Sequence, residues 1–417
     1  MITRGAVISS DARAQALREL IQTADVAFTN LEVVATDIRG YHSTGAFTPS
    51  LVAPAAVLDE LVGLFDVVSF ANNHTLNLGV EGLLDTMDGL RARGIAYAGV
   101  GRTLAEASMP AYVDRPGGSV GVVACATTFT SGDEATRPSD SMIGRPGLNP
   151  VRHTTRMGVT PDQLECLTEV HRQLGLQEQV DYLRDMRFLP PIDPTDALLF
   201  GERFFIADQP CRRTTTAPAD LDRLRKWVGE AKARSRVALV SVHSHESGAT
   251  LVEPDEFFVE FAHHMIDAGA DAVVGHGPHR VRGIEMYRGR PIFYSLGNFV
   301  AQSELAMLSS HSYDVFGVPD DRAPHDVVGA AHVGFADHEE YWRSVVPTLH
   351  FEGDRLDRIA LSPIALGYDR PEHERGRPSL SDRRVADAVL TDLRSLSAPF
   401  GTAIREDKFG AFVQLAN

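Results

Sequence analysis

Short apolar segments alternate with amphipathic helical segments along most of this chain of 417 residues. The clearest example spans residues 65–98, where two apolar segments flank a helical stripe of apolar side chains between Val80 and Leu90. Alternation of this kind is typical of a layered α/β protein whose strands are buried on both faces. We therefore predict an α/β fold with its strands in the core.

The same pattern predicts most of the other elements. We expect further strands over residues 2–8, 25–28, 119–127, 237–242, 271–274, 349–351 and 359–361. We expect helices over residues 221–233, 256–268 and 382–396, and one that begins after the N-cap residue types Ser9, Ser10 and Asp11. Residues 287–290 predict a tight hairpin turn.

Two irregular stretches, about residues 130–200 and 301–343, interrupt the alternation. The first is rich in Gly, Pro and Asp and lacks the apolar density for a core of its own. We therefore predict a single domain over residues 1–417 with two loop insertions. Long irregular loops beside an active site often serve as lids, so we expect both insertions to cover a substrate. The second insertion carries four histidines that we expect at the surface: His311, His325, His332 and His338.

The composition excludes several classes of partner. The formal net charge of −16 disfavours a nucleic-acid partner, because phosphate binding needs clustered Lys and Arg. The three cysteines lie far apart without a C-x-x-C pair, so neither a disulfide framework nor a structural zinc site is expected. No apolar stretch has the form of a signal peptide or the length of a membrane span. We expect a cytoplasmic protein with no membrane partner.

Polar residues of metal-ligand type follow four of the predicted strands. The four clusters are Asn30–Glu32, Asn72–His74, His243–Glu246 and Gly275–His279. Ligands of open α/β folds bind at the carboxyl ends of the strands, so these clusters can converge. Imidazole, carboxylate and amide oxygen suit a borderline or hard divalent ion, and we therefore predict a divalent-metal centre. No glycine-rich phosphate loop is present, so no nucleotide cofactor is expected.

Four segments of the chain resemble the CapA, or poly-γ-glutamate synthesis, family of calcineurin-like metallophosphoesterases. They are DVAFTNLE, DVVSFANNHTLNLGVEGLLDTMDGLRARGIAYAGVG, VALVSVHSHES and GADAVVGHGPHRVRGIEMYRGRPIFYSLGNF. The resemblance implies a four-layer α/β sandwich in a single domain, with a metal site at one edge. The metal ligands that it implies are Glu32, Asn73, His243 and His276. It further implies that His74 is an acid or base and His279 another ligand or a proton carrier.

The chain departs from this family at two positions. The family's first strand usually ends in Gly-Asp, whose carboxylate bridges two metals, whereas here no acid appears before Asp11. The family's N-N-H-x-x-D motif has Asn77 in place of the aspartate. Loss of a bridging carboxylate should weaken or abolish one of the two sites. We therefore expect one divalent ion, with Ca, Mn, Mg and Zn not distinguished.

A narrower resemblance suggests the reaction. The chain also resembles some CapA-like proteins with this altered first strand, encoded beside lasso-peptide precursors, which are peptide epimerases that invert the Cα of the precursor's C-terminal residue. Such a reaction needs a base on one face and an acid on the other. Asp11 could serve one face and His74 or His279 the other, and Asp85 could orient a catalytic histidine. Asp11 can equally be a helix N-cap.

The sequence is therefore compatible with three functions. The first is a metal-dependent peptide epimerase that acts on a precursor peptide without pyridoxal phosphate. The second is a CapA-like metallophosphoesterase or poly-γ-glutamate amide hydrolase that uses a metal-bound water. The third is a binding protein that keeps the fold without turnover. The missing bridging aspartate favours the first and third, and the retained histidine clusters favour the first two.

Overall fold

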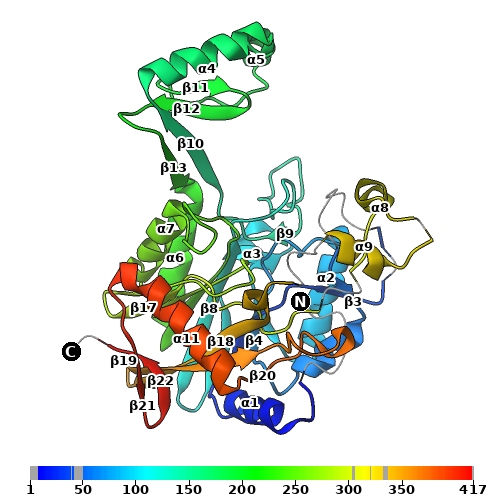
Figure 1. Cartoon of the computed structure of the whole chain (residues 1–417), viewed down its shortest axis with the longest axis vertical. Coiled ribbons are helices and arrows are strands. Elements are labelled where there is room, and N and C mark those ends of the chain that lie inside the picture. The colour runs from blue at the N-terminus through cyan, green and yellow to red at the C-terminus, as the bar shows by residue number, and fades with distance from the viewer. Residues whose placement is uncertain are drawn as a thin grey trace.

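A six-stranded sheet lies at the centre of the protein (Figure 1). The computed structural model describes residues 8–38, 40–41, 50–302, 306–319, 321–331 and 337–415. The order of this sheet is β16-β17-β15-β14-β8-β7. Its strands are β7 (Ala111–Arg115), β8 (Gly118–Ala126), β14 (Val237–His243), β15 (Ala272–His276), β16 (Ile284–Tyr287) and β17 (Arg290–Phe293). The middle strands β8, β14, β15 and β17 run parallel, so their carboxyl ends share one edge.

Helices cover one face of this sheet. Two helices, α6 (Pro218–Arg234) and α7 (Glu256–Asp267), pack on it through buried Leu, Val and Phe side chains. In α7 the apolar residues Phe257, Phe258, Phe261 and Met265 recur at helical spacing, which gives the helix one continuous buried stripe. The strands beneath are rich in Val, whose branched side chain suits a pleated surface that is buried on both faces.

A three-stranded parallel sheet packs against the other face. It consists of β1 (Phe28–Asn30), β4 (Val67–Ser69) and β5 (Ala96–Ala98), in the order β1-β4-β5. Buried Val67 and Ala98 meet Val122 and Ala124 of β8 in one apolar cluster. Helix α2 (Gly79–Ala92) joins β4 to β5, as expected of a β-α-β unit. The carboxyl ends of β1 and β4 are in register, with Asn30 opposite Ser69.

A third, antiparallel sheet and a helix complete the body of the protein. The sheet has the order β18-β19-β22-β21, and β20 (Ser379–Leu380) also pairs with β19. Its strands are β18 (Arg343–Glu352), β19 (Arg355–Ala365), β21 (Ile404–Asp407) and β22 (Gly410–Val413). Helix α11 (Arg383–Ser397) buries Val389, Leu390 and Leu393 against it. Helix α1 (Ala12–Gln22) lies beside β20 (Figure 1).

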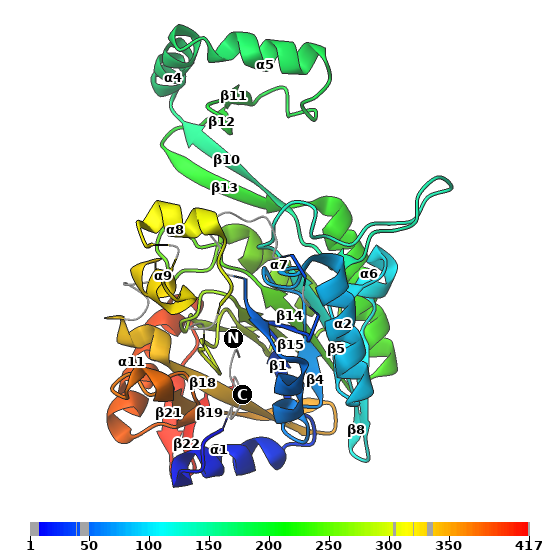
Figure 2. The same ribbon diagram turned by 90° about the vertical axis from the view of Figure 1, so that its right-hand side faces the viewer.

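An arm projects from this body, as Figures 1 and 2 both show. Its stalk is the antiparallel pair β10 (His153–Val159) and β13 (Cys211–Thr216), with His153 opposite Thr216. Strands β11 (Ala197–Leu199) and β12 (Glu202–Ile206) extend the stalk to a four-stranded sheet. Helices α4 (Pro161–Gln173) and α5 (Leu176–Asp185) lie at its far end. The sequence has a helical pattern near residues 161–174, which corresponds to α4, but no pattern that indicates the four strands.

Short elements connect the larger ones. The remaining strands are β2 (Val34–Ala35), β3 (Val52–Ala53), β6 (Val100–Gly101) and β9 (Gly147–Leu148). The remaining α-helices are α3 (Leu104–Ser108), α8 (Ser310–Phe316) and α9 (Pro324–Ala331). The 3-10 helices are η1 (Ala55–Leu61), η2 (Glu339–Trp342), η3 (Glu372–Glu374) and η4 (Ala398–Phe400). Helices α8 and α9 fall within the second predicted insertion.

The α/β class predicted from the sequence is confirmed, and the four-layer sandwich stays a prediction. The predicted hairpin turn at residues 287–290 joins β16 to β17. The strand predicted over residues 25–28 is displaced to β1 (Phe28–Asn30). Residues 1–7 of the predicted first strand lie outside the described residues. None of the helices in the described part of the chain has the length and apolar character that membrane crossing requires.

Candidate metal centre

The polar clusters that follow the strands meet at one edge of the two parallel sheets. In the six-stranded sheet the last residues of β14 and β15, His243 and His276, are paired in register. From the neighbouring sheet, the segment after β4 brings Asn73 within 2.9 Å of His243, measured from Asn73 Oδ1 to Nε2. The polar residues at the ends of strands from two different sheets therefore lie together at one site, as expected for the carboxyl ends of parallel strands.

A continuous chain of hydrogen bonds runs through three of the four predicted ligands. Because Asn73 Oδ1 can only accept, His243 Nε2 carries the proton of that bond. In a neutral ring His243 Nδ1 then accepts from His276 Nδ1 at 2.9 Å, and His276 Nε2 accepts from Ser241 Oγ at 2.8 Å. Burial lowers the pKa of His276 to about 4 and that of His243 well below its usual value. Both rings are therefore neutral, the form that a metal requires, but each ring nitrogen takes part in one of these hydrogen bonds, so a metal would have to replace a bond to be held by either ring.

Glu32 lies next to this chain and has a carboxylate oxygen without a hydrogen-bond donor. The side chain is 6% exposed, and its Oε2 accepts from Asn30 Nδ2 at 3.2 Å. Its Oε1 has no hydrogen-bond partner among the described residues. Burial alone would raise the pKa of Glu32, but the imidazoles of His279 and His74 hold the pKa below its usual value. A buried carboxylate oxygen without a donor is costly, and a bound cation would satisfy it.

His245 supplies a second unsatisfied atom at the same place. Its Nε2 is buried and has no hydrogen-bond partner in the described structure. One ligand atom from each of Glu32, His245 and His279 lies within 4.8 Å of the other two. Burial, and then the neighbouring His279, lowers the pKa of His245 to about 4, so its imidazole is neutral. One carboxylate and two imidazoles form a donor set that fits a borderline divalent ion.

The turn after β15 places His279 in this group. Gly277 has a φ of +125°, and a Cβ at this position would lie 2.9 Å from the backbone of Ser244. Only glycine therefore allows the close approach of this turn to the end of β14. His279 itself has a φ of +59°, a conformation that is uncommon outside glycine and that concentrates at functional sites. Its Nδ1 contacts Asn298 Oδ1 at 2.9 Å, and its Nε2 lies 3.8 Å from Glu32 Oε1.

His74 also lies next to Glu32, and hydrogen bonds fix the orientation of its ring. Its Nδ1 donates to Asn77 Oδ1 at 2.8 Å, so its Nε2 keeps a lone pair. Asn73 Nδ2 donates to that Nε2 at 3.3 Å, and Glu32 Oε1 lies 3.9 Å from it. Burial lowers the pKa of His74, against the opposing effect of Glu32. A neutral, buried imidazole whose Nε2 lone pair accepts only the long bond from Asn73 Nδ2 is suited to accept a proton once that bond is given up.

Of the predicted acidic residues, Asp11 and Asp85 make their described contacts elsewhere. Asp11 accepts from the Ser9 hydroxyl and from the backbone N–H groups of Arg13 and Ala14, as a helix N-cap does. The Ser9 bond, followed by the Ala14 bond, lowers the pKa of Asp11. Asp85 accepts from the Thr36 hydroxyl and not from a histidine. The N-cap role of Asp11 is confirmed, whereas the catalytic roles of both residues stay predictions.

The histidines of the second insertion fall in two groups. His311 and His338 are exposed, in agreement with the expected surface location. His332 lies outside the described residues, and the side chain of His325 is not described. The sequence comparison of strand ends grouped His245 with His243 but did not select it as a ligand. The H-x-H spacing was the available signal, since the centroids of the two rings lie 5.0 Å apart.

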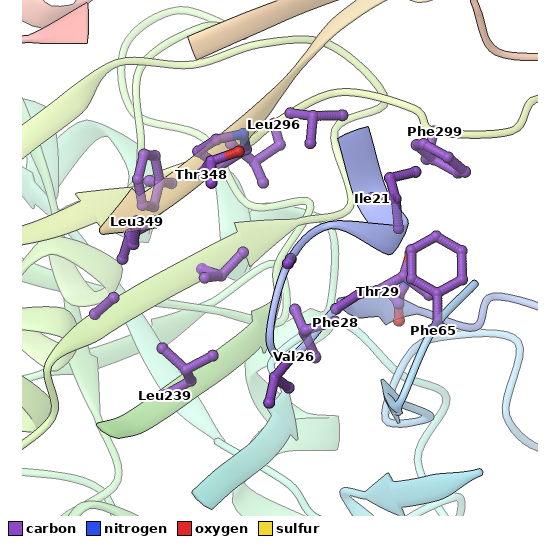
Figure 3. Close-up of a pocket in the computed structure, with 18 of the residues that line it drawn as sticks. Ile21, Val26, Phe28, Thr29, Phe65, Leu239, Leu296, Phe299, Thr348 and Leu349 are labelled. Atoms are coloured by element: carbon purple, nitrogen blue, oxygen red, sulfur yellow. The ribbon is translucent and has the colours of Figure 1, made fainter. Parts of the chain in front are cut away.

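A cavity of about 720 Å³, bounded by the described residues, extends from the site between β1, β15 and β18. Glu32, His276 and His279 contribute to its lining. Apolar side chains line much of the rest, and Figure 3 shows Phe28, Leu239, Leu296 and Leu349 among them. The described wall on this side of the metal centre is therefore largely apolar.

Comparisons with known proteins identify the family of the chain. Residues 3–303 match the family model described as bacterial capsule synthesis protein PGA_cap. The chain belongs to this family. It is 36% identical over 411 residues to the uncharacterized protein y4sH of Sinorhizobium fredii, which covers 94% of this chain and 86% of that protein.

Two further relatives have descriptive names. The chain is 41% identical over 83 residues to the PGA biosynthesis protein CapA of Bacillus subtilis, covering 20% of this chain and 21% of that protein. It is 29% identical over 241 residues to the probable polyglutamine synthesis accessory protein MT0602 of Mycobacterium tuberculosis, covering 57% of this chain and 46% of that protein. The CapA resemblance stated from the sequence motifs is therefore confirmed.

Proposed function

We propose that the protein is a metal-dependent hydrolase that cleaves amide bonds in a glutamate polymer. The observation that carries this proposal is the ligand group of Glu32, His245 and His279, two of whose members have a buried atom without a hydrogen-bond partner among the described residues, Glu32 Oε1 and His245 Nε2. Two buried polar atoms without partners are costly unless a ligand satisfies both. A divalent ion held there would activate a water molecule and polarise the bond to be broken.

The side chains around the ligand group can perform the proton transfers of hydrolysis. His74 is neutral and has its Nε2 lone pair on the side of Glu32, 3.9 Å from Oε1. It can accept the proton of the attacking water and return it to the leaving nitrogen, so the protons balance over the reaction. Asn77 holds the ring in the required tautomer through Nδ1. The residues of the site therefore supply both an ion-binding group and a general base.

The substrate class rests on the names of relatives. The names of the relatives from Bacillus subtilis and Mycobacterium tuberculosis refer to the synthesis of glutamate or glutamine polymers. An amide bond in such a polymer is a reasonable target for an activated water. A phosphoester is the alternative hydrolase substrate, because the same ion could stabilise charge on a phosphoryl oxygen.

A peptide epimerase is the second candidate. His74 and His279 both approach Glu32 Oε1, at 3.9 Å and 3.8 Å, and so place two imidazoles next to one ligand group. Two groups that transfer protons are the minimum for inversion of a Cα centre. Against this candidate, the contacts of Asp11 described above are those of an N-cap. Inversion would therefore depend on the two histidines.

One experiment separates these functions. Metal-loaded protein is incubated in D₂O with γ-linked glutamate oligomers, a phosphomonoester and C-terminally free peptides, and the products are analysed by mass spectrometry and chiral chromatography. Chain cleavage that depends on metal and is lost in His74→Gln supports the amide hydrolase. Phosphate release supports the phosphoesterase, and deuterium uptake at Cα without cleavage supports the epimerase. Metal-replete protein that changes none of the three substrates would overturn the hydrolase proposal.

A further inference from the structure

The arginine at position 282 is buried beneath the loop that carries His245. Arg282 is 1% exposed and lies between the turn that holds His279 and strand β16. It is the largest of the fully buried side chains among the described residues. Arginine is almost never fully buried unless its donors are used, so its partners indicate what it does.

The partners of Arg282 are backbone carbonyls of one loop. Its Nη1 donates to the carbonyl of Glu246 at 2.8 Å, and its Nη2 donates to the carbonyl of Leu251 at 3.1 Å. Nη2 also lies 3.5 Å from the carbonyl of His245. One rigid guanidinium therefore ties together both ends of the segment 245–251, which the flexible single ammonium of lysine could not do in the same way.

Arg282 keeps its charge although the burial is costly. Burial lowers the pKa of Arg282 to about 10, so the side chain is still protonated near neutral pH. Its Nε–H has no acceptor in the described part of the chain. A charged side chain with one unsatisfied donor costs stability, and a methionine would fill a similar volume without this cost.

The other side of the loop is held by hydroxyl groups. The backbone N–H of His245 donates to Thr128 Oγ1 at 2.8 Å, just beyond the end of β8. The same hydroxyl contacts the Glu246 carboxylate at 2.9 Å, and Thr127 and Ser244 also donate to that carboxylate. Both backbone polar groups of His245 thus face fixed partners, Thr128 on one side and Arg282 on the other. The imidazole is left to point toward Glu32 and His279.

We propose that Arg282 is a positioning residue for the metal centre: it holds the His245 imidazole in the ligand group with Glu32 and His279 and thereby sets the affinity for a divalent ion. The proposal rests on the proposed function only in that both need the same ion. Replacement of a residue that orients a metal ligand typically lowers the metal affinity about 10- to 100-fold. Replacement of Arg282 should have an effect of this size although the side chain does not touch the ion.

The test compares two buried arginines. Arg282→Lys keeps the charge but cannot bridge the loop. Arg223→Lys is the matched control, because Arg223 has a side chain that is 9% exposed and donates to Asn149 and Pro150, away from the ligand group. For each variant, zinc and manganese affinities are measured by competition with a chelator, and the thermal midpoint is measured without metal.

We expect Arg282→Lys to weaken metal binding about 10- to 100-fold while one ion still binds at saturation. Arg223→Lys should lower the thermal midpoint and leave the affinity unchanged. Equal losses of thermal midpoint in both variants, with wild-type affinity in Arg282→Lys, would overturn the positioning role. If Arg282→Lys does not fold, Thr128→Val tests the other side of His245, and a wild-type affinity in that variant would equally overturn it.

The outcomes are separable from those of the proposed function. Wild-type protein that binds metal but cleaves no substrate contradicts the hydrolase and leaves the role of Arg282 intact, because affinity is measured without turnover. Wild-type protein that binds neither zinc nor manganese overturns the positioning role directly.

Discussion

His74 Nδ1 donates a hydrogen bond to Asn77 Oδ1 at 2.8 Å, three residues further along the turn that precedes α2. The same amide oxygen accepts from the backbone N–H of Leu51 at 2.7 Å, so a single atom fixes both a loop and the imidazole. The bond fixes the tautomer of His74 and leaves the lone pair on Nε2, which lies 3.9 Å from Glu32 Oε1 and accepts from Asn73 Nδ2 at 3.3 Å. Asn77, which the sequence marked only as a departure from a family motif, therefore supports the proposed base.

Replacement of Asn77 should separate these two roles. Asn77→Ala leaves the buried Leu51 N–H unsatisfied, so we expect a loss of about 1–3 kcal/mol in the free energy of unfolding, together with reduced turnover. Asn77→Asp keeps the acceptor and places a negative charge beside the ring, which should raise the pKa of His74. Denaturant titration and an NMR titration of His74 measure the two effects. An Asn77→Ala protein with normal stability and turnover would contradict both roles.

Glu32→Gln tests the ligand group directly. Glutamine keeps the shape of the side chain but removes the charge that a divalent ion needs, so we expect metal content to fall close to zero. The thermal midpoint of the metal-free protein should not fall, because Oε1 has no donor to lose among the described residues. Elemental analysis after dialysis, with Glu253→Gln at an exposed position as a control, measures the change. Wild-type metal content in Glu32→Gln would rule out this carboxylate as a ligand.

The role of Asp11 can be decided by comparing two substitutions. Asp11→Ala removes the N-cap of α1 and should cost about 1 kcal/mol, whereas Asp11→Asn caps nearly as well and should leave the thermal midpoint almost unchanged. If the protein is a hydrolase that uses His74, turnover should stay near normal in both variants. Loss of turnover or of deuterium exchange in a folded, metal-replete Asp11→Asn protein would instead support the epimerase, since asparagine cannot accept a proton.

The sequence predicted the elements that bury a continuous apolar stripe or strand. Helix α7 and strand β14 fall within a residue or two of their expected bounds, because local pattern and burial agree there. The convergence of four strand ends was predictable for the same reason, since parallel strands bring their carboxyl ends to one edge. Strand β1 was displaced because the pairing with β4, a contact between distant segments, decides which residues of that apolar run join the sheet.

What the sequence could not provide depends on loop geometry. The direction of the His245 ring is set by Arg282 and Thr128, which lie far from it in sequence and have no motif that signals the contact. The strands of the arm were also missed. The stalk strands β10 and β13 consist mostly of polar and charged residues, so the period of two that marks a half-buried strand is weak there.

The attachment of the arm to the body provides a last prediction, which concerns Asp255. This residue precedes α7, but its carboxylate does not cap the helix and instead accepts from Arg212 and Thr214 of stalk strand β13. Asp255 is fully buried, and Arg212 also donates to the carbonyl of Ser247 in the loop that carries His245. The base of the arm is thus tied to the loop of the metal centre. We therefore expect the arm to lose its fixed position when this carboxylate is removed.

Asp255→Ala should lower the free energy of unfolding by about 3 kcal/mol, which is the lower end of the range for removing one partner of a buried ion pair. The lower end is expected because the Arg212 side chain is partly exposed. The amides of β10 and β13 should exchange faster with deuterium, and metal affinity should fall if the loop moves with the stalk. Arg213→Ala is the matched control, since its pair with Glu256 is exposed and should contribute less than about 1 kcal/mol. Hydrogen exchange followed by mass spectrometry measures the exchange rates of the stalk amides directly. Equal exchange in the two variants would mean that Asp255 does not hold the arm, and the stalk would then depend on its backbone pairing alone.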